Sequence, residues 1–330
     1  MNIKTKYLGM ELKSPLVVAA SPLSEKIENI KKLEEAGASA IVLHSLFQEQ
    51  VESEQKELHH FINSTEFVSA EATSYFPEPD EYRLGPEEYL NHIRKAKEAV
   101  NIPIIASLNG SSTGGWIDYA DIMQEAGADA IELNLYDIPT NLDSPGSDIE
   151  NRYIDVVKAV RSNIHIPLAV KISPYYSNMA NMALRFKEAG ADALVMFNRF
   201  YQPDINLDEL EVEPKVALSH SGSSRLAMRW IAILKGRVNL DFAATSGIHT
   251  GKDVIKSLLV GANAVMLASA LLKNGIDYLK VIEKEMVDWL TKNEYKSVEQ
   301  MIGSMSQMKT PNPGDFERAQ YMKALKNYVF

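Results

Sequence analysis

The stretch Glu125-Ala-Gly-Ala-Asp-Ala-Ile-Glu-Leu133 follows a pattern that this chain of 330 residues uses four times. The other copies are Glu35-Ala-Gly-Ala-Ser-Ala-Ile-Val-Leu43, Glu188-Ala-Gly-Ala-Asp-Ala-Leu-Val-Met196 and Val260-Gly-Ala-Asn-Ala-Val-Met-Leu267. In each copy a helix end is followed by a glycine and then by a short apolar run. Glycine just past a helix adopts the left-handed conformation that ends it at little cost. The pattern therefore predicts four joints from helix to strand.

Other apolar runs, each preceded by turn residues, predict four more strands. They lie at 15–20, 103–108, 167–172 and 240–245. Segments with apolar residues three and four apart predict helices between the strands, at 26–36, 117–126, 149–160, 179–189, 225–234 and 251–259. Strands that alternate with helices form a parallel sheet, and eight repeats predict closure into an α/β fold, the (β/α)8 TIM barrel. A doubly wound open sheet is the alternative.

The length and the spacing predict one domain over residues 1–330, with two additions to a minimal barrel. A long insertion from Gln48 to about Asn101 separates strands 2 and 3 and is a candidate lid, or else a plain surface excursion. A C-terminal helical extension follows Gly275 and contains a capping box, Ser297-Val-Glu-Gln300. We assign this extension to packing.

Composition excludes several classes of function. The chain has no cysteine, so thiolate-ligated clusters, cysteine-ligated zinc and a cysteine nucleophile or base are absent, and we expect no metal site. A net charge of -10 argues against nucleic-acid binding and against anionic membranes. The N-terminal apolar run is too short for a signal segment or a membrane span, so we expect a cytoplasmic protein.

Polar residues at the predicted strand ends indicate a site, because a barrel interior otherwise favours branched apolar side chains. The residues at these ends are Ser21, His44, Ser45, Ser107, Asn109, Asn134, Lys171, Asn198, Ser246, Gly247, Ala268 and Ser269, and all but Gly247 and Ala268 are polar. The carboxyl ends of all eight strands meet at one face of a barrel. We therefore expect these residues to surround a single ligand.

The last two strands carry the most specific motif. The end of strand 7 and the loop after it read Ala244-Thr-Ser-Gly-Ile-His-Thr-Gly-Lys-Asp253, and strand 8 and its loop read Gly261-Ala-Asn-Ala-Val-Met-Leu-Ala-Ser-Ala270. Glycine and serine after both strands let backbone N–H groups approach a phosphate, which predicts the phosphate site of a barrel. Ser221-Gly-Ser-Ser224 is a third possible set of donors, with Ser221 and Gly222 as candidate cofactor-binding residues, or a simple N-cap.

Lys171 stands in the apolar strand Pro167-Leu-Ala-Val-Lys-Ile-Ser-Pro174. An ammonium in such a strand needs an anionic or electron-rich partner. A flavin meets this need, since positive charge stabilises the reduced anionic ring. The alternative is the Schiff-base lysine of an aldolase, which would be a non-redox phosphate-binding barrel enzyme.

These motifs resemble those of the dihydroorotate dehydrogenases, FMN-dependent (β/α)8 barrels, and especially the soluble class 1 enzymes. The similarity covers nearly the whole chain, at stretches such as Tyr7-Leu-Gly-Met-Glu-Leu-Lys-Ser-Pro15, Glu132-Leu-Asn-Leu135 and Thr245-Ser-Gly-Ile248. The resemblance implies FMN as the cofactor and a homodimer. The residues implied to contact the flavin ring are Ala20, Ser21, Ser45, Asn134 and Lys171. Those implied to hold the phosphate are Ser246, Gly247, Ala268 and Ser269.

The substrate half of the site departs from the family pattern. Family members place a lysine where this chain has His44, and a cysteine or serine base where it has Asp137. Asp137 is thus a candidate base for the acidic proton of a CH–CH bond next to a carbonyl, or only the end of the strand. In the reverse direction, His44 or Tyr136 would donate the proton. We expect His44, Asn109 and Asn198 to contact the substrate.

The favoured hypothesis is an FMN-dependent oxidoreductase that converts dihydroorotate to orotate in pyrimidine biosynthesis, or acts on another ene or pyrimidine substrate. Its electrons would pass to a soluble acceptor or to a partner redox protein. The alternatives are the aldolase-type enzyme and a flavin-binding electron-transfer subunit.

Overall fold

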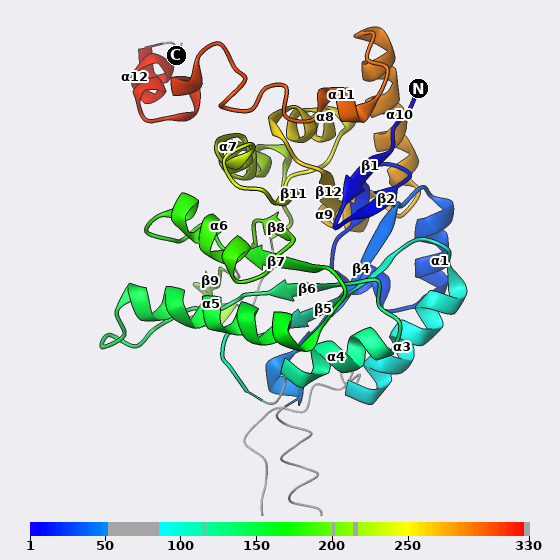
Figure 1. Cartoon of the computed structure of the whole chain (residues 1–330), viewed down its shortest axis with the longest axis vertical. Helices are drawn as coiled ribbons and strands as arrows, with labels where there is room; N and C mark the ends of the chain where they lie inside the picture. The colour runs from blue at the N-terminus through cyan, green and yellow to red at the C-terminus, as the bar shows by residue number, and fades with distance from the viewer. Residues whose placement is uncertain (52–85, 115–116, 200–201, 214–216, 327–330) are drawn as a thin grey trace, which may run out of the picture.

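A computed structural model of the chain describes residues 1–51, 86–114, 117–199, 202–213 and 217–326. Its eight main strands are β3 (Leu16–Val18), β4 (Ala40–Phe47), β5 (Ile104–Asn109), β6 (Ala130–Asn134), β7 (Leu168–Ile172), β8 (Ala193–Met196), β11 (Asp241–Thr245) and β12 (Ala264–Leu267). They pair in parallel and close into a barrel in the order β11-β12-β3-β4-β5-β6-β7-β8 (Figure 1). The predicted (β/α)8 TIM barrel is confirmed, and the open sheet is excluded.

Helices follow the strands as the repeated joints predict. Those between barrel strands are α1 (Ile27–Glu35), α3 (Pro86–Ala99), α4 (Asp118–Glu125), α5 (Gly146–Asn163), α6 (Met179–Glu188), α7 (Ser224–Leu234) and α8 (Gly251–Val260). Short 3-10 turns are η1 (Pro22–Ser24), η4 (Ser221–Ser223) and η5 (Pro313–Phe316). All four joint glycines, Gly37, Gly127, Gly190 and Gly261, have positive φ angles. The joints therefore turn in the way that only glycine allows cheaply.

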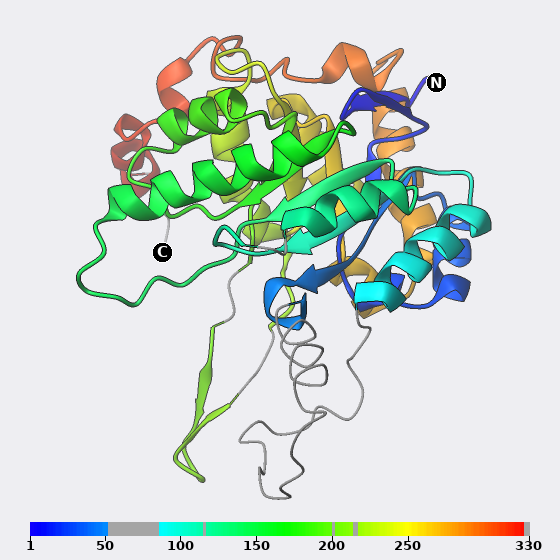
Figure 2. The same cartoon turned by 60° about the horizontal axis from the view of Figure 1, so that its bottom comes forward.

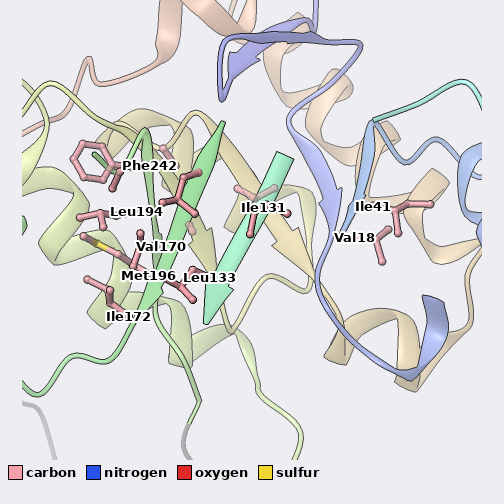
Figure 3. Packing of buried hydrophobic residues seen from close by; sticks show 14 of the residues in the cluster. Val18, Ile41, Ile131, Leu133, Val170, Ile172, Leu194, Met196 and Phe242 are labelled. Carbon is pink, nitrogen blue, oxygen red and sulfur yellow. The ribbon is translucent and has the colours of Figure 1, made fainter. Parts of the chain in front are cut away.

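Outward-facing strand residues pack against the helices. Ile131 and Leu133 of β6 alternate with inward-facing neighbours and lie beside Val170 of β7 and Leu194 of β8 (Figure 3). All four side chains are fully buried. This layer holds the helices on the barrel and leaves the inward positions for the site.

Small residues fill the barrel interior at the amino-terminal ends of the strands, and an N-terminal hairpin covers this end of the barrel. The interior alanines are Ala40, Ala130, Ala169, Ala193, Ala243 and Ala264. The hairpin consists of β1 (Thr5–Tyr7) and β2 (Met10–Leu12) and buries Tyr7, Leu8 and Leu12 against these alanines. Because the alanines leave room for the larger side chains, this end of the barrel is closed.

The C-terminal extension is helical, as predicted. It comprises α10 (Tyr278–Lys292), α11 (Val298–Met301) and α12 (Ala319–Lys326), while the short helix α9 (Ser269–Asn274) precedes Gly275 and follows β12. Ser297 caps α11, since its hydroxyl accepts a hydrogen bond from the backbone N–H of Gln300 at 3.2 Å. The glutamine side chain accepts from the N–H of Lys296 at 3.1 Å. Within the described ranges, no helix combines the length and apolar character that a bilayer crossing needs.

Two additions follow barrel strands. The insertion after β4 lies mostly outside the described residues, at 52–85, so the candidate lid stays a prediction. After β8, an antiparallel ribbon of β9 (Asp204–Asn206) and β10 (Glu211–Glu213) projects from the barrel (Figure 2). The sequence pattern of alternating helices and strands did not predict this ribbon.

Candidate active site

A cavity of about 500 Å³ lies at the carboxyl ends of the barrel strands. Its size is typical of a site for a small organic ligand or cofactor. Predicted site residues that line it are Ala20, Ser21, Ser45, Asn109, Asn134, Lys171, Asn198, Ser246, Gly247, Ala268 and Ser269. A larger groove, of about 920 Å³, lies between α7, α8 and the C-terminal tail, away from the strand ends. Barrel enzymes bind at the strand ends, so we place the site in the smaller cavity.

The structure gives Lys171 an anionic partner inside the barrel. Its Nζ lies 3.3 Å from Oε1 of Glu132, and the two side chains are 12% and 0% exposed. Lys171 lines the cavity, whereas Glu132 lies among the interior residues and does not. The ammonium at this strand end is therefore half of a buried ion pair, which the sequence analysis did not foresee.

Two asparagines join the ends of neighbouring strands. Asn198 donates from Nδ2 to Oδ1 of Asn134 at 2.6 Å and to the carbonyl oxygen of Leu135 at 3.2 Å. A longer contact of 3.4 Å reaches the carbonyl oxygen of Lys171. Both asparagines are buried and line the cavity. Asn198 thus fixes the β6 and β7 ends beside the ligand space.

Ser219, which the sequence analysis missed, connects the loops after β8, β11 and β12. Its hydroxyl accepts from the N–H of Gly247 at 3.2 Å and bonds to Nε2 of His249 at 3.1 Å. Its own N–H donates to Oγ of Ser269 at 3.2 Å, and Lys273 donates to its carbonyl oxygen at 3.0 Å. The two predicted phosphate loops are therefore brought together around one serine.

Asp253 holds the first of these loops in place. One of its carboxylate oxygens accepts from the N–H groups of His249 at 3.1 Å and Thr250 at 3.0 Å. The same oxygen accepts from Oγ of Ser221 at 2.8 Å. Ser221 and its neighbour Gly222 do not line the cavity, so in this structure Ser221 braces the loop. The Thr250-x-x-Asp253 capping box was the sequence signal for this arrangement.

A β-bulge moves His44 out of the predicted site. Val42 of β4 pairs with Ile105, but Ser45 pairs with Ser107, so β4 has one residue more than β5 over this span. Ser45 therefore faces inward, and its hydroxyl lies 2.8 Å from that of Ser107. His44 faces α3 instead, where its ring centroid lies 5.1 Å from that of Tyr89.

We expect His44 to make stability depend on pH. Burial, and secondarily His92, lower the pKa of His44 to about 4, and both ring nitrogens are buried with no hydrogen-bond partner among the described residues. Since the unfolded state binds the proton first, stability falls as the pH falls from about 6.5 toward 4. His44→Phe should flatten that slope and cost nothing at pH 7. Urea midpoints between pH 7 and pH 4.5 measure this, with exposed His165→Gln as the control. An unchanged slope would contradict the assignment.

Asp137 also lies outside the cavity lining. Its carboxylate forms an ion pair with Arg152 of α5. The preceding residue, Tyr136, does line the cavity, as does Arg199 after β8. Among the described lining residues, the side chains that carry an ionisable proton are Tyr136, Lys171 and Arg199. Tyr136, which lines the cavity, is therefore better placed than Asp137 for the predicted proton transfer.

A closed barrel with a polar cavity at its carboxyl strand ends belongs to the class of (β/α)8-barrel enzymes. The family model described as dihydroorotate dehydrogenase matches residues 83–290, so the chain belongs to the dihydroorotate dehydrogenase family. The suspected resemblance is thereby confirmed.

Curated relatives agree with this assignment. A Thermoplasma volcanium protein named "Dihydroorotate dehydrogenase B (NAD(+)), catalytic subunit" is 26% identical over 309 residues, which cover 92% of this chain and 98% of that protein. A Methanocaldococcus jannaschii protein of the same name is 26% identical over 311 residues, covering 91% and 97%. A Bacillus pumilus protein of that name is 30% identical over 214 residues, covering 62% and 68%.

Proposed function

We propose that this chain is an FMN-dependent oxidoreductase that removes two hydrogens from a CH–CH bond next to a carbonyl, with dihydroorotate as its substrate. The observation that supports this most is the joining of Lys171 and the paired glycine and serine loops in one cavity of about 500 Å³. The ammonium of Lys171 suits the flavin ring of FMN, and the two loops that contain glycine and serine suit its phosphate. Family membership supports the same reading.

The residues present fit this cofactor. Ser21 lines the cavity, and its Oγ is buried with no hydrogen-bond partner among the described residues, so this serine is a candidate for a polar contact to a ligand. Gly247 packs so closely on the start of α7 that a Cβ would lie 2.4 Å from N of Ser224. The missing Cβ lets this loop lie against the N-terminus of α7, and helix N-termini favour phosphate.

When bound, FMN supplies the hydride acceptor. The chain itself must hold the ring and remove a proton from the carbon next to the carbonyl. We propose that Tyr136, which lines the cavity, takes up this proton as its phenolate and becomes a phenol, with the carboxylate of Asp137 as the alternative base. Arg199 would supply the cation for a substrate carboxylate, since the family lysine is replaced by the outward-facing His44.

Electron transfer out of the site involves a partner in this proposal. The names of the relatives describe catalytic subunits of NAD(+)-linked enzymes, which is consistent with a second subunit that receives the electrons. A small soluble acceptor is the alternative. By family resemblance we also propose a homodimeric, cytoplasmic protein.

The visible absorbance spectrum of the purified protein tests the proposal. We expect the two bands of oxidised flavin and their bleaching on anaerobic addition of dihydroorotate. Bands that persist would indicate another ene or pyrimidine substrate, and an absence of bands after reconstitution with FMN would end the flavin proposal. The bleaching rate then assigns the base: Tyr136→Phe should slow it about 100-fold, and Asp137→Asn less than about tenfold. The reverse order would return the role to Asp137.

A further inference from the structure

Glu132 is an acidic residue at an interior barrel position where related segments have apolar ones. In the four copies of the repeated joint it corresponds to Val42, Val195 and Met266. Those three belong to the apolar cluster inside the barrel. An ionised carboxylate is costly at such a position unless it is paired. The substitution of an acid for an apolar residue therefore points to a specific role.

Lys171 is the partner that the structure gives Glu132. Oε1 lies 3.3 Å from Nζ, while Oε2 is buried with no hydrogen-bond partner among the described residues. The phenol of Tyr7, beneath it in the closed end of the barrel, likewise has none there, and its pKa is raised first by burial and then by Glu132. Among the described residues, the ammonium of Lys171 is thus the polar group that compensates the buried carboxylate of Glu132.

The two charges lie at different distances from the cavity, and this determines the charge that a ligand meets. Lys171 is 12% exposed and lines the cavity, whereas Glu132 is 0% exposed and lies behind it. A ligand in the cavity therefore meets an ammonium whose charge is partly offset by the carboxylate behind it. Because the interior has a low dielectric constant, this second charge is felt strongly.

We propose that Glu132 is a positioning residue that fixes the ammonium of Lys171 at the cavity floor and tunes the reduction potential of the bound flavin by offsetting that charge. This inference rests on the proposed function, since it needs FMN in the cavity. It adds an internal counter-charge to the lysine and sets how readily the cofactor accepts electrons from the substrate.

The midpoint potential of the bound flavin in Glu132→Gln tests this inference. Glutamine keeps the shape of the side chain and removes its negative charge, so the reduced anionic ring should be favoured. We expect the equilibrium constant for two-electron reduction to rise about tenfold, which is a potential about 30 mV more positive. The equilibrium constant for sulfite addition to the flavin should rise in the same direction.

The same substitution made in a Lys171→Met variant distinguishes the positioning of Lys171 by Glu132 from simple structural support. In Lys171→Met, replacing Glu132 by glutamine should raise the potential by less, because the ammonium that Glu132 holds in place is absent and only the direct effect of the carboxylate charge remains. Asp241→Asn is the matched control, since it removes a partly buried acid at the opposite end of the barrel, beside Leu8. It should leave the potential of the flavin unaltered.

Each outcome decides the inference. If Glu132→Gln does not fold, Glu132→Asp, which draws the charge back, should move the potential in the positive direction by a smaller amount. An unchanged potential in the glutamine variant, or an equal shift in both lysine backgrounds, would overturn the inference while the flavin bands of the wild-type protein keep the proposed function intact. A wild-type protein that binds no FMN would overturn both.

Discussion

Lys171→Met is expected to lower the free energy of unfolding by about 3–5 kcal/mol. The substitution leaves the carboxylate of Glu132 fully buried, and the 3.3 Å contact to Lys171 is the pairing that the described residues give it. Urea unfolding measures the loss. We also expect the variant to lose turnover of dihydroorotate, since Lys171 forms the cationic floor of the cavity.

Two variants show whether burial causes this loss. Lys97 forms an ion pair with Asp129 at 2.7 Å, but these side chains are 33% and 30% exposed. Lys97→Met should therefore cost about 1 kcal/mol or less. The double variant Lys171→Met/Glu132→Gln, which leaves no unpaired charge, should recover most of the lost stability. Equal losses for Lys97→Met and Lys171→Met would show that the interior pair has no special weight.

The barrel could be predicted because its signal is local and repeated. Each joint has a glycine that ends a helix and an apolar strand beyond it, and these features depend on neighbours in the chain. Together with the four strands that follow other turn residues, these make eight strands with few ways to bury their apolar faces, and closure is the one the structure shows. The polar strand ends then meet at one face, which is why most of the predicted site residues line one cavity.

Departures from strict alternation could not be predicted in the same way. His44 would face inward in a regular strand that starts at Val42, but one extra residue in β4 turns it toward α3. Nothing in the local sequence marks this bulge. Past the strand ends, the period of two is lost, so counting alone could not tell that Tyr136 lines the cavity while Asp137 pairs with Arg152.

The interior position of Glu132 could have been predicted from the sequence, although the sequence analysis did not predict it. Comparison of the four repeated joints shows one acid at a position with Val42, Val195 and Met266 in the other copies. The alternation of the strand places that position inside the barrel, and Lys171 is at an inward position of the next strand. An internal comparison of repeated segments can therefore identify interior charge pairs from the amino-acid sequence alone.

Gly247→Ala is expected to abolish tight FMN binding and to lower the free energy of unfolding by about 2–5 kcal/mol. Gly247 has a φ angle of +83°, and a Cβ there would lie 2.4 Å from N of Ser224 and 2.9 Å from the carbonyl oxygen of His220. Both contacts are with backbone, which cannot move aside as a side chain can. Relief requires a shift of the loop that Ser219 ties to the second phosphate loop.

Gly275→Ala separates the effect of close packing from the effect of backbone conformation. Gly275 has nearly the same φ angle, +84°, but a Cβ there would meet nothing within 4 Å. Its replacement should cost only the strain of an alanine at φ +84° and ψ 167°, a conformation that glycine almost alone adopts, about 1–3 kcal/mol, and leave FMN affinity unchanged. Titration of the apoproteins with FMN, followed by flavin fluorescence, measures the difference, which we expect to be about 100-fold in dissociation constant. If the two alanine variants bound FMN equally well, the loop of Gly247 would not be the one that holds the phosphate, and the cofactor would have to lie elsewhere along the cavity.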